Sequence, residues 1–67
     1  METFSQQLKT LRNEKKLSLS ELARNIGVSD VAVGRWERGL QIPNIENLVL
    51  IAKHFGVSTD YLLGLED

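Results

Sequence analysis

The amino-acid sequence predicts an all-helical protein, a compact bundle of five helices formed by a single domain over residues 1–67. Apolar residues recur at intervals of three and four, with no sustained alternation of the kind that strands show. Each expected helix also carries its own start and stop residues. A length of 67 residues allows one domain, and a hydrophobic content of 42% is enough for one small core.

The first helix is expected to cover about Thr3 to Lys15. Its apolar face follows the positions i, i+4 and i+7, which are Phe4, Leu8 and Leu11. Thr3 is suited to cap this helix, and Gln6, three residues later, is suited to be the reciprocal partner in a capping box.

Two short helices follow, separated by three residues. The run Ser18-Leu19-Ser20-Glu21 forms a second capping box, and Gly27 occupies the position where a left-handed glycine ends a helix. Ser29 is the expected cap of a third helix, which runs from Asp30 to about Arg38, before Gly39. The two helices within residues 18–38 therefore meet at a tight corner.

A fourth and a fifth helix complete the bundle. Asn44 is the expected cap of the fourth helix, and Gly56 is its expected stop. The apolar side of this helix carries Ile45, Leu48, Ile51, Ala52 and Phe55. Ser58 and Gly64 bound a last short helix.

The composition excludes several classes of protein. The sequence has no cysteine, which excludes disulfide scaffolds, thiol catalysis and the usual zinc-finger ligand sets. Its longest apolar run, residues 48–52, is far shorter than the roughly 18 residues that cross a bilayer. Because the N-terminal residues also lack the features of a secretory signal, we expect a cytoplasmic protein with no membrane partner.

Groups that carry catalysis are scarce. The single histidine, His54, is expected on the polar side of the fourth helix, with no nucleophile or metal partner at a useful spacing. The serines are accounted for as helix caps. We therefore expect no enzymatic activity, no cofactor, no metal and no small-molecule ligand.

Charge is unevenly distributed along the chain. The net charge is −1, but residues 1–40 hold seven basic and five acidic residues, whereas residues 41–67 hold one basic and four acidic residues. A protein that turns one face to phosphate shows this kind of polarity. The polarity alone is not specific, since a solvated surface can divide in the same way.

The corner between the second and third helices points to a class of function. Two short helices joined by only Gly27, Val28 and Ser29 form a helix-turn-helix, in which the second helix is free to project. The major groove of B-DNA, about 12 Å wide, admits one such helix. An ordinary helical hairpin has the same spacing, so spacing leaves both interpretations open.

The residues around the corner follow a specific pattern. They read Leu17-Ser18-x-x-Glu21-Leu22-Ala23-x-x-Ile26-Gly27-Val28-Ser29, then Val33-x-x-Trp36-Glu37-x-Gly39, then Pro43, then Leu48-x-x-Ile51-Ala52-x-x-Phe55-Gly56-Val57-Ser58. This pattern resembles the Cro/cI-type helix-turn-helix family, which includes phage repressors, and the resemblance extends from about Leu8 to Gly64. It implies a five-helix bundle of the lambda-repressor type that binds operator DNA, usually as a dimer.

The resemblance implies that one face of the third helix meets the base edges of DNA, while Val33 turns inward. The residues on this face are Asp30, Val31, Ala32, Gly34 and Arg35. Arg35 is the expected direct reader, because a guanidinium pairs with O6 and N7 of guanine. Val31 and Ala32 are expected against thymine methyl groups, and Asp30 is expected to support the helix cap first and specificity second. Gly34 either permits a close approach to DNA or is a tolerated surface glycine.

Phosphate contacts are expected at the edges of the same unit, because helix N-termini direct free N–H groups and a positive dipole at anions. The expected positions are Ser18, Leu19, Ser29, Arg38, Gln41 and Asn44. The chain departs from the family at Leu19, where a phosphate-binding glutamine is common. Gln41, in the loop before Pro43, is the expected replacement.

Two further positions have expected structural roles. In the family, the positions of Arg12 and Glu37 form an internal ion pair between the first helix and the end of the third. We expect this pair here in preference to a contact between Arg12 and DNA. Trp36, next to Glu37, is expected to cover the core.

The expected function is therefore transcriptional regulation, most simply repression, by a homodimer bound to double-stranded operator DNA. Leu50, Leu63 and Leu65 extend apolar surface on the fourth helix and at the C-terminal end. They are the expected dimer contacts if this surface is not simply the periphery of the core or a docking site for another protein. The alternative function is a protein-interaction module, as in antitoxins that share this domain.

Overall fold

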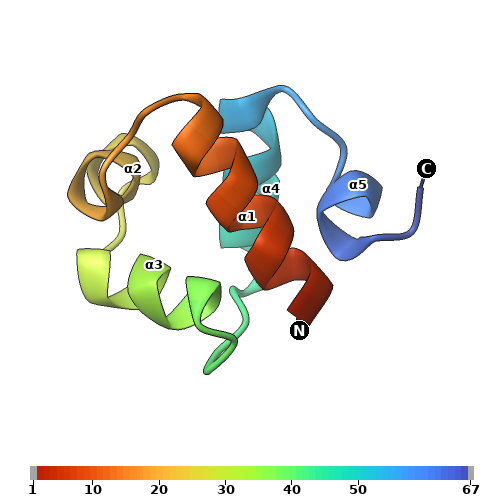
Figure 1. Cartoon of the computed structure of the whole chain (residues 1–67), viewed down its shortest axis with the longest axis horizontal. Coiled ribbons are helices and arrows are strands. Elements are labelled where there is room, and N and C mark those ends of the chain that lie inside the picture. Colours follow the sequence, from red (N-terminus) through yellow and green to blue (C-terminus); the bar gives the residue numbers. More distant parts are fainter. Residues whose placement is uncertain (1, 67) are drawn as a thin grey trace.

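Five α-helices form most of residues 2–66, the part of the chain that this computed structural model describes. They are α1 (Glu2–Glu14), α2 (Leu19–Ile26), α3 (Asp30–Glu37), α4 (Ile45–Phe55) and α5 (Thr59–Leu63). Figure 1 shows α1 crossing in front of α4, with α2 and α3 on one side and α5 on the other. The expected fold class, an all-helical bundle of five helices, is confirmed.

Side-chain caps begin four of the five helices at the predicted residues. A side-chain oxygen accepts a hydrogen bond from the backbone N–H three residues later at Ser18, Ser29, Asn44 and Ser58. Glu21 Oε1 accepts a hydrogen bond from the Ser18 N–H at 2.9 Å, which completes the expected capping box. These bonds satisfy donors that a helix leaves unpaired in its first turn, and each contributes on the order of 1 kcal/mol.

The prediction for the start of α1 is wrong. The helix already includes Glu2, so Thr3 lies inside its first turn and does not cap it, and Gln6 has no reciprocal role. Thr3 lies instead against the end of α5, since a Cβ placed on Gly64 would come within 2.5 Å of Thr3 Cγ2. The first turn of α1 therefore packs against the end of α5.

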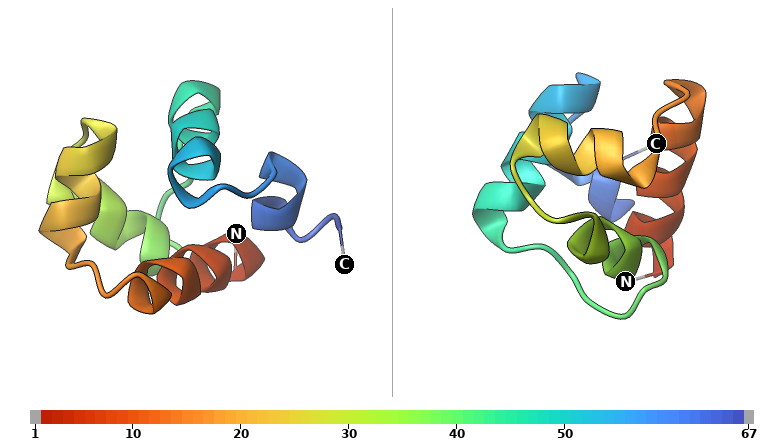
Figure 2. Two further views of the ribbon diagram at one scale, coloured as in Figure 1. Left: turned by 90° about the horizontal axis from the view of Figure 1, so that it is seen from above. Right: turned by 90° about the vertical axis from the view of Figure 1, so that its left-hand side faces the viewer.

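Every helix contributes to the core. The largest fully buried side chains are Phe4, Leu8, Leu22, Val33, Ile51 and Leu62. Complete burial of such a side chain contributes about 1.5–3 kcal/mol. Ile45, expected on the core side of α4, is instead 80% exposed. Figure 2 shows the reason: the first turn of α4 projects beyond the helices that cover the rest of α4.

Polar contacts fix α1 between α3 and α5. The buried hydroxyl of Ser5 donates to the carbonyl of Trp36 at 2.6 Å, which joins α1 to α3. The Gln7 amide donates to the carbonyl of Tyr61 at 3.3 Å, which joins α1 to α5. The position of α3 thus depends on α1 as well as on its neighbour α2.

Candidate nucleic-acid interface

A tight corner joins α2 to α3. Gly27 adopts the left-handed conformation, with φ of 79°, which a residue with a Cβ adopts only at a cost in free energy. The N–H groups of Gly27 and Val28 both donate to the carbonyl of Ala23, which closes the end of α2. Figures 1 and 2 show α2 and α3 together along one side of the molecule.

The outer face of α3 carries most of the side chains expected to read DNA. Asp30, Val31 and Arg35 are exposed and Ala32 is partly exposed, whereas Val33 is completely buried. Within residues 2–66, Arg35 forms no ion pair. Its guanidinium is therefore available to an acceptor outside the protein.

Gly34 is buried, contrary to the expectation of an exposed position. A Cβ placed on it would lie 3.9 Å from Leu19 Cδ1 and 3.9 Å from Arg38 Nη2. Gly34 therefore faces α2, and not the outer surface of α3. Leu19 is itself partly buried against the core, so that only its backbone N–H remains to meet a phosphate.

The three helix starts expected to contact phosphate use their capping oxygens internally. Ser18, Ser29 and Asn44 each accept a backbone N–H of their own helix, at 3.0, 3.1 and 2.8 Å. The N–H groups left for an anion belong to the first two residues of each helix. Arg38 and Gln41 are exposed after α3, where a flexible side chain can reach a phosphate.

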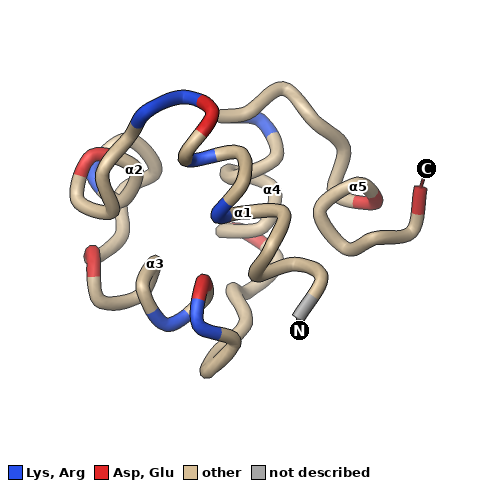
Figure 3. The backbone as a smooth tube through the Cα atoms, in the orientation of Figure 1, with Lys and Arg blue, Asp and Glu red and all other residues tan. Residues whose placement is uncertain are grey.

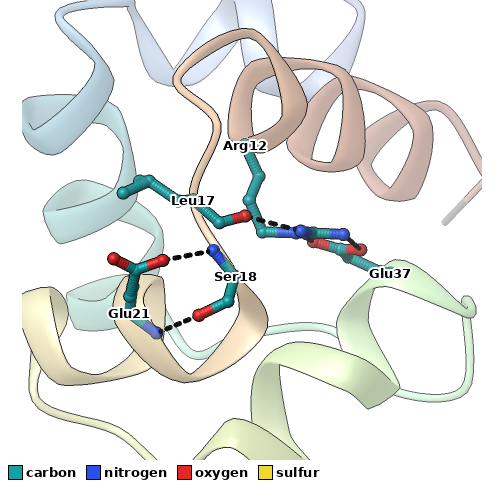
Figure 4. Close-up of polar contacts among 5 residues, drawn as sticks. All are labelled: Arg12, Leu17, Ser18, Glu21 and Glu37. Carbon is teal, nitrogen blue, oxygen red and sulfur yellow. Dashed lines mark hydrogen bonds and ion pairs between the residues drawn. The ribbon is translucent and has the colours of Figure 1, made fainter.

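Arg12 and Glu37 form the expected ion pair, drawn in Figure 4. Arg12 Nε and Nη2 donate to the two carboxylate oxygens of Glu37 at 2.5 and 2.9 Å, and Nη1 donates to the carbonyl of Leu17 at 2.8 Å. The hydrogen bond to Glu37 raises the pKa of Arg12 above its ordinary value. With its donors used in this way, Arg12 holds α1, α3 and the start of α2 together.

The structure buries Trp36 as expected but places His54 in a contact with α2 that was not expected. Trp36 is 2% exposed and covers the core, as expected. His54 is not on an open polar face: it is partly buried, and its Nε2 lies 3.2 Å from Asn25 Nδ2 of α2. The pattern of α4 alone could not indicate this contact, because α2 is distant in sequence.

An apolar groove of about 200 Å³ lies where α1, α4 and α5 meet the loop before α4. It is lined by Phe4, Ile42, Pro43, Ile45, Leu48 and Leu63. At its edge, Ile42 is 56% exposed and Ile45 is 80% exposed. Of the expected dimer contacts, Leu63 lines this groove, whereas Leu50 and Leu65 are exposed outside its lining.

Charges differ between the two ends of the molecule. Figure 3 shows only acidic charge on α5 and the segment after it, at the end opposite α2 and α3.

Among residues 2–66, no cluster of three acidic, histidine or cysteine side chains is suited to hold a metal ion. No helix in this range combines the length and hydropathy required to cross a membrane.

Comparison with known protein families identifies the family to which this domain belongs. A model described as helix-turn-helix (HTH_3) matches residues 8–62, which include both helices of the corner and most of the core. The chain belongs to this helix-turn-helix family. The resemblance found in the sequence pattern is thereby confirmed.

Two relatives of this helix-turn-helix domain are regulators of transcription by name. The chain is 38% identical over 64 residues to the HTH-type transcriptional regulator YobD of Bacillus subtilis, which covers 96% of the chain and 57% of YobD. It is 41% identical over 64 residues to the HTH-type transcriptional activator BcrR of Enterococcus faecalis, covering 96% of the chain and 31% of BcrR. The chain thus spans less than two thirds of either relative.

A solved complex has a similar fold. The c2 repressor of Salmonella phage P22, in complex with a synthetic operator, superimposes with a TM-score of 0.89 at 35% sequence identity. The match covers 94% of this chain and 96% of the repressor chain in that structure.

Proposed function

We propose that this helix-turn-helix domain is a sequence-specific transcriptional regulator that inserts α3 into the major groove of operator DNA. The observation that carries the proposal is the similarity of the fold, at a TM-score of 0.89, to a repressor in complex with an operator. The exposed Arg35 on α3, which has no ion pair within residues 2–66, supports it. The domain acts by occupying its site, as a repressor in the simplest case, and performs no chemistry.

The division of contacts follows from exposure and chemistry. Arg35 reads guanine through O6 and N7, while Val31 and Ala32 contact thymine methyl groups. Arg38 and Gln41 bind phosphates, together with the free N–H groups at the starts of α2, α3 and α4. Phosphate contacts set the position of the protein on the duplex, and base contacts give sequence preference.

We also infer that two copies bind a palindromic or nearly palindromic operator, with half-sites about one helical turn apart. The apolar groove supports a contact between the copies, because Ile42 and Ile45 project beside it and exposed apolar patches mark interaction sites. The groove is lined by six residues, whereas a stable complex uses roughly 20–30 residues on each side. The dimer therefore forms chiefly on DNA, where the two copies are held together.

Selection of bound sequences from random double-stranded DNA tests this proposal. We expect one enriched motif with two-fold symmetry, and a mass in solution that corresponds to two chains per duplex. Binding to unrelated DNA should weaken steeply with salt, because phosphate contacts release counterions. A folded chain that enriches no sequence would contradict the proposal.

A protein-interaction role is the alternative, and the apolar groove is the observation that favours it. The same selection distinguishes the two functions. A domain that only binds protein enriches no DNA, whatever the substitution on α3. A regulator enriches DNA, and substitutions on α3 change the enriched sequence.

A further inference from the structure

Asp30 makes one side-chain contact in the described chain, and it is to the other helix of the corner. Ser20 Oγ lies 3.3 Å from Asp30 Oδ2 and donates to it. Ser20 is the second residue of α2, and Asp30 is the first residue of α3. The contact therefore joins the first turns of the two helices at the surface of the corner.

Neither side chain is needed to cap its own helix. Ser18 and Glu21 complete the capping box of α2, and Ser29 Oγ accepts the Ala32 N–H at the start of α3. Asp30 accepts no backbone N–H of α3, although a capping carboxylate would do so. The support that Asp30 gives to the cap is therefore the attraction of its carboxylate to the N-terminus of α3, without a hydrogen bond to a backbone N–H.

The surroundings of Asp30 are unusual for a surface that binds phosphate. Its side chain is exposed and forms no ion pair within residues 2–66. The free N–H groups of α2 and α3 begin beside it, so a carboxylate at this point repels the phosphates that those groups attract. In a phosphate-binding role alone, Asp30 would weaken binding without any gain.

We propose that Asp30 reads cytosine in the operator, and that Ser20 is the positioning residue that holds its carboxylate. The proposal rests on the proposed function, since it requires α3 in the major groove. Asp30 Oδ1 has no partner in the described chain and accepts a hydrogen bond from cytosine N4. Guanine and thymine present acceptors at the major-groove edge, and adenine places the N7 acceptor next to its N6 donor. A carboxylate therefore accepts a hydrogen bond from cytosine and is repelled by the acceptor atoms of the other bases.

The position of Asp30 relative to Arg35 gives the proposal a geometric consequence. The two residues are five positions apart on α3, which is roughly 7.5 Å along the helix axis. The half-site is therefore expected to contain a cytosine read by Asp30 and a guanine read by Arg35 at distinct base pairs.

The test is selection from random DNA with the wild-type chain and with four variants: D30A, D30N, S20A and S20T. The wild-type chain should select a cytosine that D30A no longer selects, with a loss of discrimination of about tenfold or more at that base pair. D30N should select adenine at the same position, because asparagine pairs with adenine N6 and N7. The guanine read by Arg35 should stay unchanged in all four variants.

Ser20 is tested separately from stability. S20A should keep the midpoint of thermal unfolding, followed by the fluorescence of Trp36, and should lose several-fold of the preference for cytosine. S20T retains the hydroxyl and should restore that preference. A purely structural role of Ser20 would change the unfolding midpoint and would not change the preference for one base.

The outcomes separate this inference from the proposed function. If the wild-type chain enriches no sequence, the proposed function fails. If the wild-type chain enriches an operator but D30A selects the same bases at every position, the inference fails and the proposed function stands. An even rise in affinity of D30A for all sequences, with unchanged base preference, means that Asp30 only repels phosphate and also overturns the inference.

Discussion

The guanidinium of Arg12 and the carboxylate of Glu37 meet through two hydrogen bonds, with side-chain exposures of only 14% and 7%. The pair joins α1 to the last residue of α3, two residues after the exposed Arg35. Removing one partner of such a pair leaves the other charge buried without a counter-charge, which costs about 3–5 kcal/mol. The effect is large for a chain of 67 residues, whose whole stability is on the order of 3–10 kcal/mol.

Arg12→Ala should therefore lower the Tm by more than about 10 °C in a domain of this size. The measurement is thermal unfolding by circular dichroism, with the exposed Arg24→Ala as the control that should change little. Replacing both partners by methionine should recover much of the loss, because no unpaired charge remains. An unchanged Tm in Arg12→Ala would show that the pair is not structural.

The capping box should make stability depend on acid pH. The hydrogen bonds from the backbone and side chain of Ser18 lower the pKa of Glu21. A carboxyl group with a lowered pKa in the folded state stabilises the fold above its unfolded pKa, and this contribution disappears as pH falls through the lowered value. When the pH is lowered from about 7 to about 3, the Tm of the wild-type chain should decrease more than the Tm of Glu21→Gln. The amide of glutamine retains the capping hydrogen bond and does not titrate.

Glu14→Gln is the matched control for this pH dependence, since Glu14 makes no side-chain hydrogen bond or ion pair in the described chain. The decrease in Tm between neutral and acid pH should be the same for Glu14→Gln as for the wild type. Equal losses in all three proteins would mean that Glu21 does not carry the effect.

Gly34→Ala should stabilise the domain. The new Cβ meets Leu19 and Arg38 at 3.9 Å, an ordinary van der Waals distance, and alanine is favoured over glycine inside a helix by about 0.5–1 kcal/mol. Affinity for DNA should not change, because Gly34 is buried. Denaturant unfolding and a DNA titration measure the two effects, and a loss of affinity would place Gly34 at the DNA after all.

Gly27→Ala, in contrast to Gly34→Ala, should destabilise the domain. Nothing lies within 4 Å of a Cβ at Gly27, but its φ of 79° is unfavourable for alanine, and we expect a loss of about 1 kcal/mol from this alone. If Gly27→Ala were as stable as the wild type, the corner would have relaxed to another conformation.

Arg35→Ala should relax the preference for one base pair in each half-site and leave binding to random DNA nearly unchanged. Arg38→Ala should weaken binding to all sequences evenly and reduce the salt dependence by the equivalent of about one phosphate contact. Both side chains are exposed, so neither change should affect folding. An even loss of affinity in Arg35→Ala would make Arg35 a phosphate contact.

Ile45→Glu should weaken binding to an operator with two half-sites, with no effect on binding to a single half-site. The substitution places a charge at the edge of the apolar groove, and Ile45 is 80% exposed, so the fold should tolerate it. Leu50→Glu, which lies outside the groove lining, should behave as the wild type. The reverse result would assign the dimer contact to the face of α4 that carries Leu50.

Much of the fold could be predicted from the sequence because its signals are local. A cap such as Ser29 needs only a backbone N–H three residues away, and a left-handed stop such as Gly27 depends on one pair of dihedral angles. The Arg12–Glu37 pair could be expected from the family resemblance, although its partners are 25 residues apart.

The rest depends on contacts that no local pattern encodes. The family resemblance placed Gly34 on the outward face of α3, but Leu19 of α2 and the side chain of Arg38 lie over it, and it is buried. Periodicity placed Ile45 on the core side, although no helix covers the first turn of α4. The contact between Ser20 and Asp30 arises only when the two helices are crossed.

Along α3, the anchoring and the outward-facing positions alternate. Val33, Trp36 and Glu37 hold the helix to the rest of the domain, while Asp30, Val31 and Arg35 make no contribution to the core. This separation makes the domain suitable for retargeting. A library randomised only at the three outward positions should retain its fold in most members, and new operator preferences can be sought without re-engineering the scaffold.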